Sequence, residues 1–243
     1  MIRFFVEPED LEEDFPRLTG ENANHGRVLR QRTGEQLLLC DGQGLEALCR
    51  ISGVEGKDFC LEVVERRESV TEPSVRVSIY MAFAKADKLE HVIQKATELG
   101  AYEIVTFPTA RCVSRPDSKS LEKKLERWQK IAASAAEQSG RGRIPRVVVL
   151  SGYDEALERG TKADKALLFY ENEHATTLKM ALSSGKMETV SLLTGPEGGL
   201  EEDEVKKASG MGFTVCTLGS RILRCETAPL CALSAVMFAA GEF

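Results

Sequence analysis

The spacing of apolar residues predicts short strands in the first part of the chain. Short apolar runs separated by turn-forming residues indicate strands over residues 2–6, 36–41, 45–51 and 58–65. The second and third of these flank Gly42-Gln43-Gly44, a turn that is typical of a hairpin. A segment of this size buries little core of its own. We therefore expect a small β-barrel domain that precedes a larger one.

From about residue 75 onward, apolar strands alternate with amphipathic helices. Strands are predicted over residues 75–83, 103–107, 146–150, 166–170, 189–194 and 213–218. Helices are predicted over residues 87–99, 121–138, 201–209 and 229–240. Continuous apolar strands that alternate with helices indicate an α/β fold, with a mostly parallel sheet covered on both faces. The polar segment 66–74, which contains Pro73, predicts a boundary between domains 1–70 and 71–243.

The charge of the chain is unevenly distributed. Its 243 residues have a formal net charge of −6. Residues 111–146 hold ten basic and four acidic side chains, so this segment carries +6 and the remainder −12. A local basic face on an acidic protein can bind phosphates, because the field near the surface matters more than the total charge. The alternative is a solvated helix with ion pairs along its surface.

Two further features limit the class of protein. The apolar run over residues 228–240 is shorter than the roughly 20 residues that span a bilayer, and the first residues lack the apolar core of a secretory signal. We therefore expect a cytoplasmic protein with no membrane partner. The seven cysteines include no CxxC pair, which favours reduced thiols and no metal site.

Two loops carry the candidate chemistry, because each follows a predicted strand and precedes a helix. Ligands of parallel sheets bind beyond the carboxyl ends of strands. The first loop, residues 194–200, has three glycines in five residues, which lets the backbone approach a ligand closely. The second, residues 218–228, mixes apolar residues with Arg224, Glu226 and Thr227. Each loop also has an alternative interpretation in which it binds no ligand. The first would be a tight turn between strand and helix, and the second a capped helix start.

Taken together, the two loops resemble the C-terminal signature of a known family. The matching residues are Gly195-Pro196-Glu197-Gly198-Gly199, Leu218-Gly219, Arg221-Ile222-Leu223-Arg224 and Glu226-Thr227-Ala228. They resemble the RsmE family of SPOUT methyltransferases. Residues 85–100 and 136–141 are similar to two further stretches of that family, and residues 25–42 to its PUA-like RNA-binding domain. Cys225 and Pro229 depart from it, since a threonine and a small apolar residue are more usual there.

The resemblance implies a fold and a reaction that periodicity does not show. It implies a SPOUT-type parallel sheet with a C-terminal deep trefoil knot, and a small N-terminal PUA-like β-barrel. S-adenosylmethionine would bind in the knot of a homodimer. The substrate would be 16S, small-subunit ribosomal RNA, naked or in the assembled subunit, and the product N3-methyluridine. The implied cofactor-binding residues are Leu193, Thr194, Gly195, Glu197, Gly199, Leu218, Gly219, Ile222, Leu223, Thr227 and Ala228.

For that reaction, Arg224 and Glu226 of the second loop are the candidate catalytic residues. N3 of uridine carries a proton, so a base or an anion-stabilising cation is needed. Arg224 would stabilise the uridine anion or bind the adjacent phosphate, and Glu226 would accept the proton or orient Arg224. The expected RNA-binding residues are Arg27, Arg30, Arg111, Arg115, Arg141 and Arg143. The alternatives are a SPOUT enzyme that methylates ribose 2′-hydroxyls of tRNA or rRNA, and a non-catalytic RNA-binding factor of ribosome assembly.

Overall fold

The computed structural model describes residues 1–115, 118–183 and 185–243. Asp117, which we counted in the basic segment, lies outside these residues. The chain forms two compact units. The first contains Met1–Glu72 and Ala136–Ile144, and the second contains Pro73–Ala135 and Pro145–Phe243. Within the described residues, no helix is long and apolar enough to cross a membrane.

The first unit is built on a five-stranded sheet. The strands run in the order β1 (Arg3–Phe5), β3 (Gln36–Cys40), β4 (Leu45–Glu55), β5 (Asp58–Glu68) and β2 (Arg17–Leu18). The predicted hairpin of β3 and β4 is confirmed. One carboxylate oxygen of Asp41 accepts hydrogen bonds from the backbone N–H groups of Gln43, Gly44 and Leu45 at 2.7–3.0 Å, which closes the turn. The 3-10 helix η1 (Pro8–Leu11) and helix α1 (Gly20–Val28) complete this unit.

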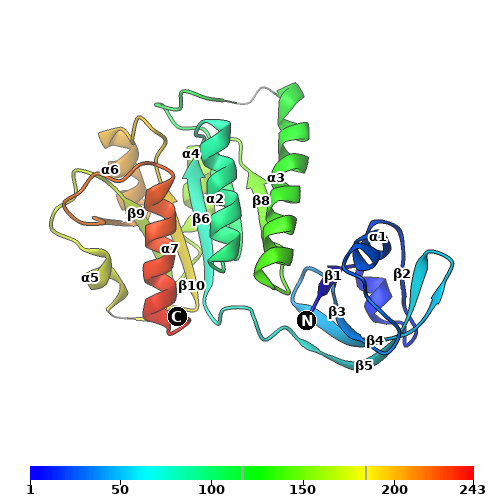
Figure 1. Ribbon diagram of the computed structural model, residues 1–243. Helices are drawn as coiled ribbons and strands as arrows, with labels where there is room; N and C mark the ends of the chain where they lie inside the picture. Colours follow the sequence, from blue (N-terminus) through cyan, green and yellow to red (C-terminus); the bar gives the residue numbers. More distant parts are fainter. Residues whose placement is uncertain (116–117, 184) are drawn as a thin grey trace. The chain divides into compact units, whose positions relative to one another are not determined.

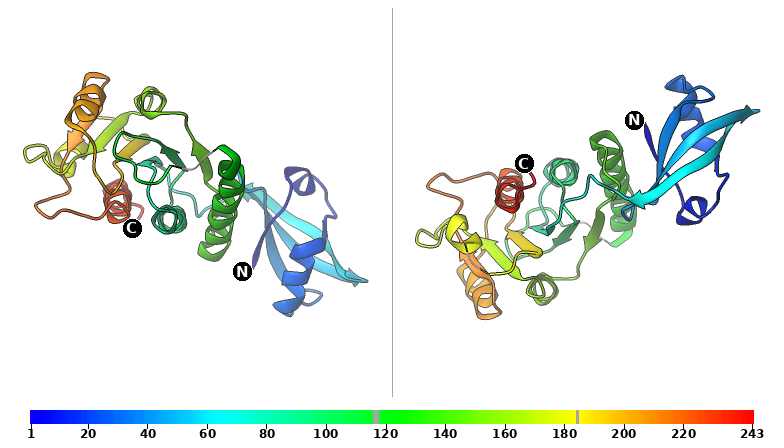
Figure 2. Two further views of the ribbon diagram at one scale, coloured as in Figure 1. Left: turned by 90° about the horizontal axis from the view of Figure 1, so that it is seen from above. Right: turned by 90° about the horizontal axis from the view of Figure 1, so that it is seen from below.

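The second unit is built on a six-stranded parallel sheet (Figure 1). Its strands run in the order β11 (Thr214–Cys216), β9 (Lys165–Phe169), β10 (Thr189–Thr194), β6 (Arg76–Ala82), β7 (Glu103–Phe107) and β8 (Arg146–Val149). Its helices are α2 (Ala86–Glu98), α4 (Tyr153–Gly160), α5 (Leu178–Leu182), α6 (Glu202–Gly210), α7 (Thr227–Ala240) and most of α3 (Ser118–Ser139), whose residues from Ala136 onward belong to the first unit. All strand pairs are parallel. Figure 2 shows α4 and α6 on one face of the sheet, and α2 and α7 on the other. The predicted parallel sheet with two covered faces is therefore confirmed, and the trefoil knot stays a prediction.

Helix α1 was not predicted, and its composition explains why. Its sequence contains two glycines and two asparagines, which have low helix propensity, and few apolar residues. Its buried residues are Ala23 and Gly26. A Cβ atom on Gly26 would lie 3.0 Å from the ring of Phe59 on β5. The helix is therefore stabilised by close packing on the sheet, which an amphipathic pattern does not reveal.

Candidate functional site

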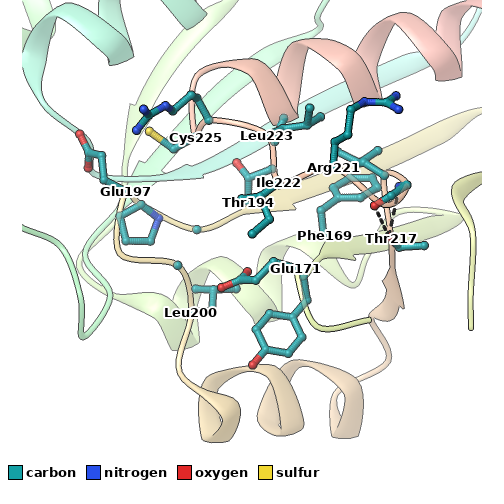
Figure 3. A pocket seen from close by; sticks show the side chains of 18 of the residues that line it. Phe169, Glu171, Thr194, Glu197, Leu200, Thr217, Arg221, Ile222, Leu223 and Cys225 are labelled. Carbon is teal, nitrogen blue, oxygen red and sulfur yellow. Dashed lines mark hydrogen bonds between the residues drawn. The ribbon is translucent and has the colours of Figure 1, made fainter. Parts of the chain in front are cut away.

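A cavity of about 420 Å³ lies at the carboxyl edge of the parallel sheet (Figure 3). Loops that follow β9, β10 and β11 line it, together with the first turn of α2. Because these strands are parallel, their carboxyl ends meet at one edge. Strand β9 lies between β10 and β11, so three loops from distant parts of the sequence converge there.

The glycine-rich loop after β10 is held in a conformation that suits glycine. The N–H of Gly199 donates to the carbonyl of Pro196 at 3.0 Å. Gly199 has φ +70°, and a Cβ atom there would lie 2.6 Å from a carboxylate oxygen of Glu171. A Cβ atom on Gly195 would lie 3.1 Å from the carbonyl carbon of Gly199 and 3.1 Å from Leu200 Cγ. The loop therefore brings bare backbone to the wall of the cavity.

Two buried oxygen atoms in this wall have no hydrogen-bond partner in the described part of the chain. They are Oγ1 of Thr194 and Oε2 of Glu197. The other carboxylate oxygen of Glu197 accepts from the backbone N–H of Lys85 at 3.0 Å, which fixes the side chain. An unpaired buried polar atom costs about 1–3 kcal/mol, so a polar ligand that pairs with it is favoured. With Glu171 also in the wall, the site suits a ligand that carries N–H or O–H donors.

The loop after β11 supplies the apolar wall. The hydroxyl of Thr217 donates to the carbonyl of Gly219 at 3.2 Å and accepts from its N–H at 3.1 Å (dashed in Figure 3). Gly219 has φ +105°, which any other residue adopts at a cost. Leu223 and Ile222 follow in the lining, and the side chain of Ile222 is 86% exposed. An apolar side chain left this open at a cavity offers surface to a flat ring.

A charged cluster lies beside this apolar wall. The ammonium of Lys88, on α2, lies 3.1 Å from Glu226 Oε2 and 3.9 Å from Glu197 Oε1. Burial opposes ionisation of Glu226, but hydrogen bonds from its own backbone, from Lys88 and from Cys225 outweigh it, so its pKa is lowered. The hydrogen bond to Glu226 raises the pKa of Lys88. Burial, and then the bond to Glu226, raises the pKa of the Cys225 thiol to about 12. At neutral pH the cluster thus holds a carboxylate, an ammonium and a protonated thiol.

Comparison with known proteins assigns the chain to a family. An RNA methyltransferase domain matches residues 71–237, and an RNA methyltransferase PUA domain matches residues 18–64. Ribosomal RNA small subunit methyltransferase E of Bacillus subtilis is 38% identical, over 98% of this chain and 96% of its own length. The chain belongs to the RsmE family. The SPOUT-type sheet and the N-terminal PUA-like domain are therefore confirmed.

Solved structures of similar proteins agree with this assignment. The crystal structure of a ribosomal RNA small subunit methyltransferase E from Neisseria gonorrhoeae, bound to S-adenosylmethionine, is 33% identical. The match covers 98% of this chain and 97% of that chain, with a TM-score of 0.84. A putative methyltransferase from Legionella pneumophila in complex with the same cofactor is 31% identical, with a TM-score of 0.80 over 98% of this chain and 97% of that chain.

Most of the residues expected to bind cofactor in this RsmE-family chain do line the cavity. They are Thr194, Gly195, Glu197, Gly199, Leu218, Gly219, Ile222, Leu223 and Ala228. Leu193 is instead fully buried in the core, and Thr227 is exposed at the start of α7. Arg224 is exposed and lines the cavity, whereas Glu226 joins it through Lys88. Glu226 does not itself line the cavity, but it contacts Lys88, which does.

Sequence reasoning missed the part of the lining that comes from β9 and α2. The missed residues include Lys88, Phe169, Tyr170, Glu171 and His174. The segment after β9 has neither glycine-rich spacing nor a signature. The sequence shows only that this segment follows an apolar strand. That position predicts a place in the cavity only when the order of the strands in the sheet is known.

The arginines expected to bind RNA are divided between the two units. Arg27 and Arg30, at the end of α1, are exposed, and Arg30 has the unusual φ of 58° for a residue other than glycine. Arg111 donates to the carbonyl of Gly198 at 3.3 Å. The side chain of Arg115 donates to the carbonyls of Thr109 and Ala110. Arg111 is therefore engaged by the glycine-rich loop, and Arg115 by the loop after β7 in which it lies.

Arg141 and Arg143 follow α3 and contact a single carboxylate. Arg141 is 4% exposed, and its guanidinium lies 2.6 Å from Glu72. The other oxygen of Glu72 accepts from the backbone N–H groups of Gly142 and Arg143 at 3.0 and 3.1 Å. A buried, paired guanidinium is not available to a phosphate, so we give Arg141 a structural role in place of the expected RNA contact.

Proposed function

We propose that this chain transfers the methyl group of S-adenosylmethionine to N3 of a specific uridine in 16S, small-subunit ribosomal RNA. The observation that carries the proposal is the cavity at the carboxyl edge of the sheet. It combines a glycine-rich loop, an apolar loop and two buried oxygens that have no partner in the described chain. The relative from Neisseria gonorrhoeae, a ribosomal RNA small subunit methyltransferase E, is bound to that cofactor.

The residues around the cavity fit this cofactor chemically. When bound, S-adenosylmethionine supplies an electrophilic methyl group on a sulfonium. The carboxylates of Glu171 and Glu197 would accept hydrogen bonds from the N–H and O–H donors of this ligand. The hydroxyl of Thr194 gives a further partner for a polar group, while Ile222 and Leu223 offer an apolar surface to the adenine ring. The bare backbone at Gly195 and Gly199 lets the ligand approach the strand end.

On the uridine side, Glu226 and Arg224 have complementary roles. Glu226 carries no proton at neutral pH, so we propose it as the acceptor of the N3 proton. Its lowered pKa makes it a weak base, so a cation that stabilises the uridine anion would assist it. Arg224 is exposed at the cavity and would stabilise the uridine anion or bind the adjacent phosphate. Turnover should fall in Arg224→Ala and Glu226→Gln. Unchanged turnover in either variant would remove that residue from the reaction.

The RNA would also be bound by residues that lie away from the cavity. We propose that residues 1–70 form the RNA-binding domain, with Arg27 and Arg30 as phosphate contacts, and that residues 71–243 form the catalytic domain. A homodimer in the cytoplasm, acting on ribosomal RNA or the assembled small subunit, completes the proposal. The PUA domain match over residues 18–64 supports the RNA-binding role of this part of the chain.

Calorimetric titration with S-adenosylmethionine tests the cofactor site. Wild type should bind, and Gly195→Val should not, because its side chain would begin 3.1 Å from the backbone of Gly199. Gly210→Ala, at the end of α6 with no atom within 4 Å of its added Cβ, is the matched control and should bind as wild type does. Absence of binding by wild type, with and without RNA, would favour the non-catalytic assembly factor.

A further inference from the structure

Lys88 is a charged residue of the cavity that the proposed chemistry does not yet use. It lies in the first turn of α2, and its side chain is 21% exposed. Its ammonium contacts two carboxylates that come from different loops: Glu197 in the glycine-rich loop and Glu226 after β11. A cation in the first turn of a helix is opposed by the helix dipole. The position of Lys88 is therefore unfavourable for α2 itself, which indicates a role in the cavity.

The two carboxylates depend on Lys88 to different extents. Glu197 already accepts from the backbone N–H of Lys85, at the start of the same helix, and Lys88 is 3.9 Å away. Glu226 has the shorter contact, 3.1 Å. The other polar neighbours of Glu226 are its own backbone N–H and the thiol of Cys225, which donates to the same carboxylate oxygen at 3.3 Å. Among the described contacts of Glu226, the one positive charge is therefore that of Lys88.

We propose that Lys88 is a positioning residue for methyl transfer, which keeps the Glu226 carboxylate ionised and fixed at the cavity to accept the N3 proton. This inference rests on the proposed function. In the step it supports, the proton of N3–H passes to Glu226. The N3 electron pair forms the new bond to the methyl carbon, and the methyl–sulfur bond breaks to leave a neutral thioether.

The pH dependence of methyl transfer should change when Lys88 is replaced. Lys88 is the cation that faces Glu226, Glu197 is a nearby anion, and Cys225 is a neutral donor. Removing the ammonium leaves the negative neighbour uncompensated, so the pKa of Glu226 should rise in Lys88→Met. A general base works only when deprotonated. The acid limb of the pH–rate profile should therefore move to higher pH in this variant.

The experiment combines a direct titration with kinetics. Carbon-13 NMR of protein labelled at the glutamate carboxyl carbons follows Glu226, which is assigned with Glu226→Gln. Lys88→Met keeps the aliphatic stem, and Lys88→Arg keeps the charge. The matched control is Lys95→Met, which removes a lysine of the same helix whose ion pair with Glu98, at 2.7 Å, lies outside the cavity lining. Turnover on small-subunit RNA and binding of S-adenosylmethionine are measured for each variant.

The inference predicts a specific set of results. In Lys88→Met, Glu226 should titrate at higher pH, which moves the acid limb of kcat. At neutral pH kcat should fall about tenfold because the carboxylate is no longer held in place, with little change in cofactor affinity. Lys88→Arg should recover most of the loss, and Lys95→Met should match wild type. Titration of Glu226 at an unchanged pH in Lys88→Met would overturn the inference. Failure of the proposed function would look different: wild type would transfer no methyl group, and the titration would still decide whether Lys88 controls Glu226.

Discussion

Substitution of Gly199 by alanine should destabilise the observed conformation of the glycine-rich loop by about 1–2 kcal/mol. Gly199 has φ +70°, a left-handed conformation that costs a residue with a side chain about 1–2 kcal/mol. The added Cβ atom would also lie 2.6 Å from a carboxylate oxygen of Glu171. Since that side chain is exposed and can rotate away, we expect the backbone term to dominate.

The cost should appear in one of two measurements. If the loop keeps its conformation, the free energy of unfolding measured in urea should fall by about 1–2 kcal/mol. If the loop relaxes, the dissociation constant for S-adenosylmethionine should rise about 5- to 30-fold, because each 1.4 kcal/mol changes affinity about tenfold. Asparagine tolerates the left-handed region better, so Gly199→Asn should lose less than Gly199→Ala.

Gly210→Ala is the control for this series. Gly210 ends α6, has no left-handed φ and has open space around its Cα. We expect its stability and cofactor affinity to remain close to those of wild type. If Gly199→Ala changed neither the free energy of unfolding nor cofactor binding, the reasoning about the loop would be refuted.

Two further substitutions and one labelling experiment test other parts of the structure. Glu46 is fully buried and lies 3.2 Å from the nearly buried Arg3. Glu46→Gln should therefore lower the free energy of unfolding in urea by about 3–5 kcal/mol, and a loss below about 1 kcal/mol would contradict the buried ion pair. Burial raises the pKa of Cys225 to about 12, so iodoacetamide at neutral pH should modify the exposed Cys231 before Cys225. Peptide mass spectrometry measures the order of modification, and the reverse order would contradict the raised pKa of Cys225. Arg27→Glu should weaken RNA binding and reduce its salt slope by about 1, whereas an unchanged slope would remove this phosphate contact.

The sequence predicts the sheet and two of the cavity loops, because their signals are local. Continuous apolar runs mark the parallel strands, and closely spaced glycines mark the loop around Gly195 and Gly199. The order of the strands is not local, since it depends on how each crossover helix packs. The position of β9 between β10 and β11 was therefore not predicted, and neither was the presence of Glu171 and His174 in the cavity.

Arg141 shows the same limit for charged residues. Its place in a basic segment predicted an RNA contact, but it is buried against Glu72, which lies 69 residues earlier in the chain. Lys88 is the opposite case. It stands in an ordinary amphipathic helix, and its contact with Glu226 joins residues 138 positions apart. A charged residue's role depends on its partner in space, which composition and spacing along the chain do not reveal.

Product analysis tests the proposed reaction most directly. Purified protein is incubated with small-subunit ribosomal RNA and S-adenosylmethionine that carries a labelled methyl group, and the RNA is then digested to nucleosides and examined by mass spectrometry. We predict that the label appears in N3-methyluridine and is lost in Glu226→Gln. Label in a ribose 2′-O-methyl group, which also blocks alkaline cleavage of the RNA, or no transfer to RNA by wild type, would contradict the proposed function.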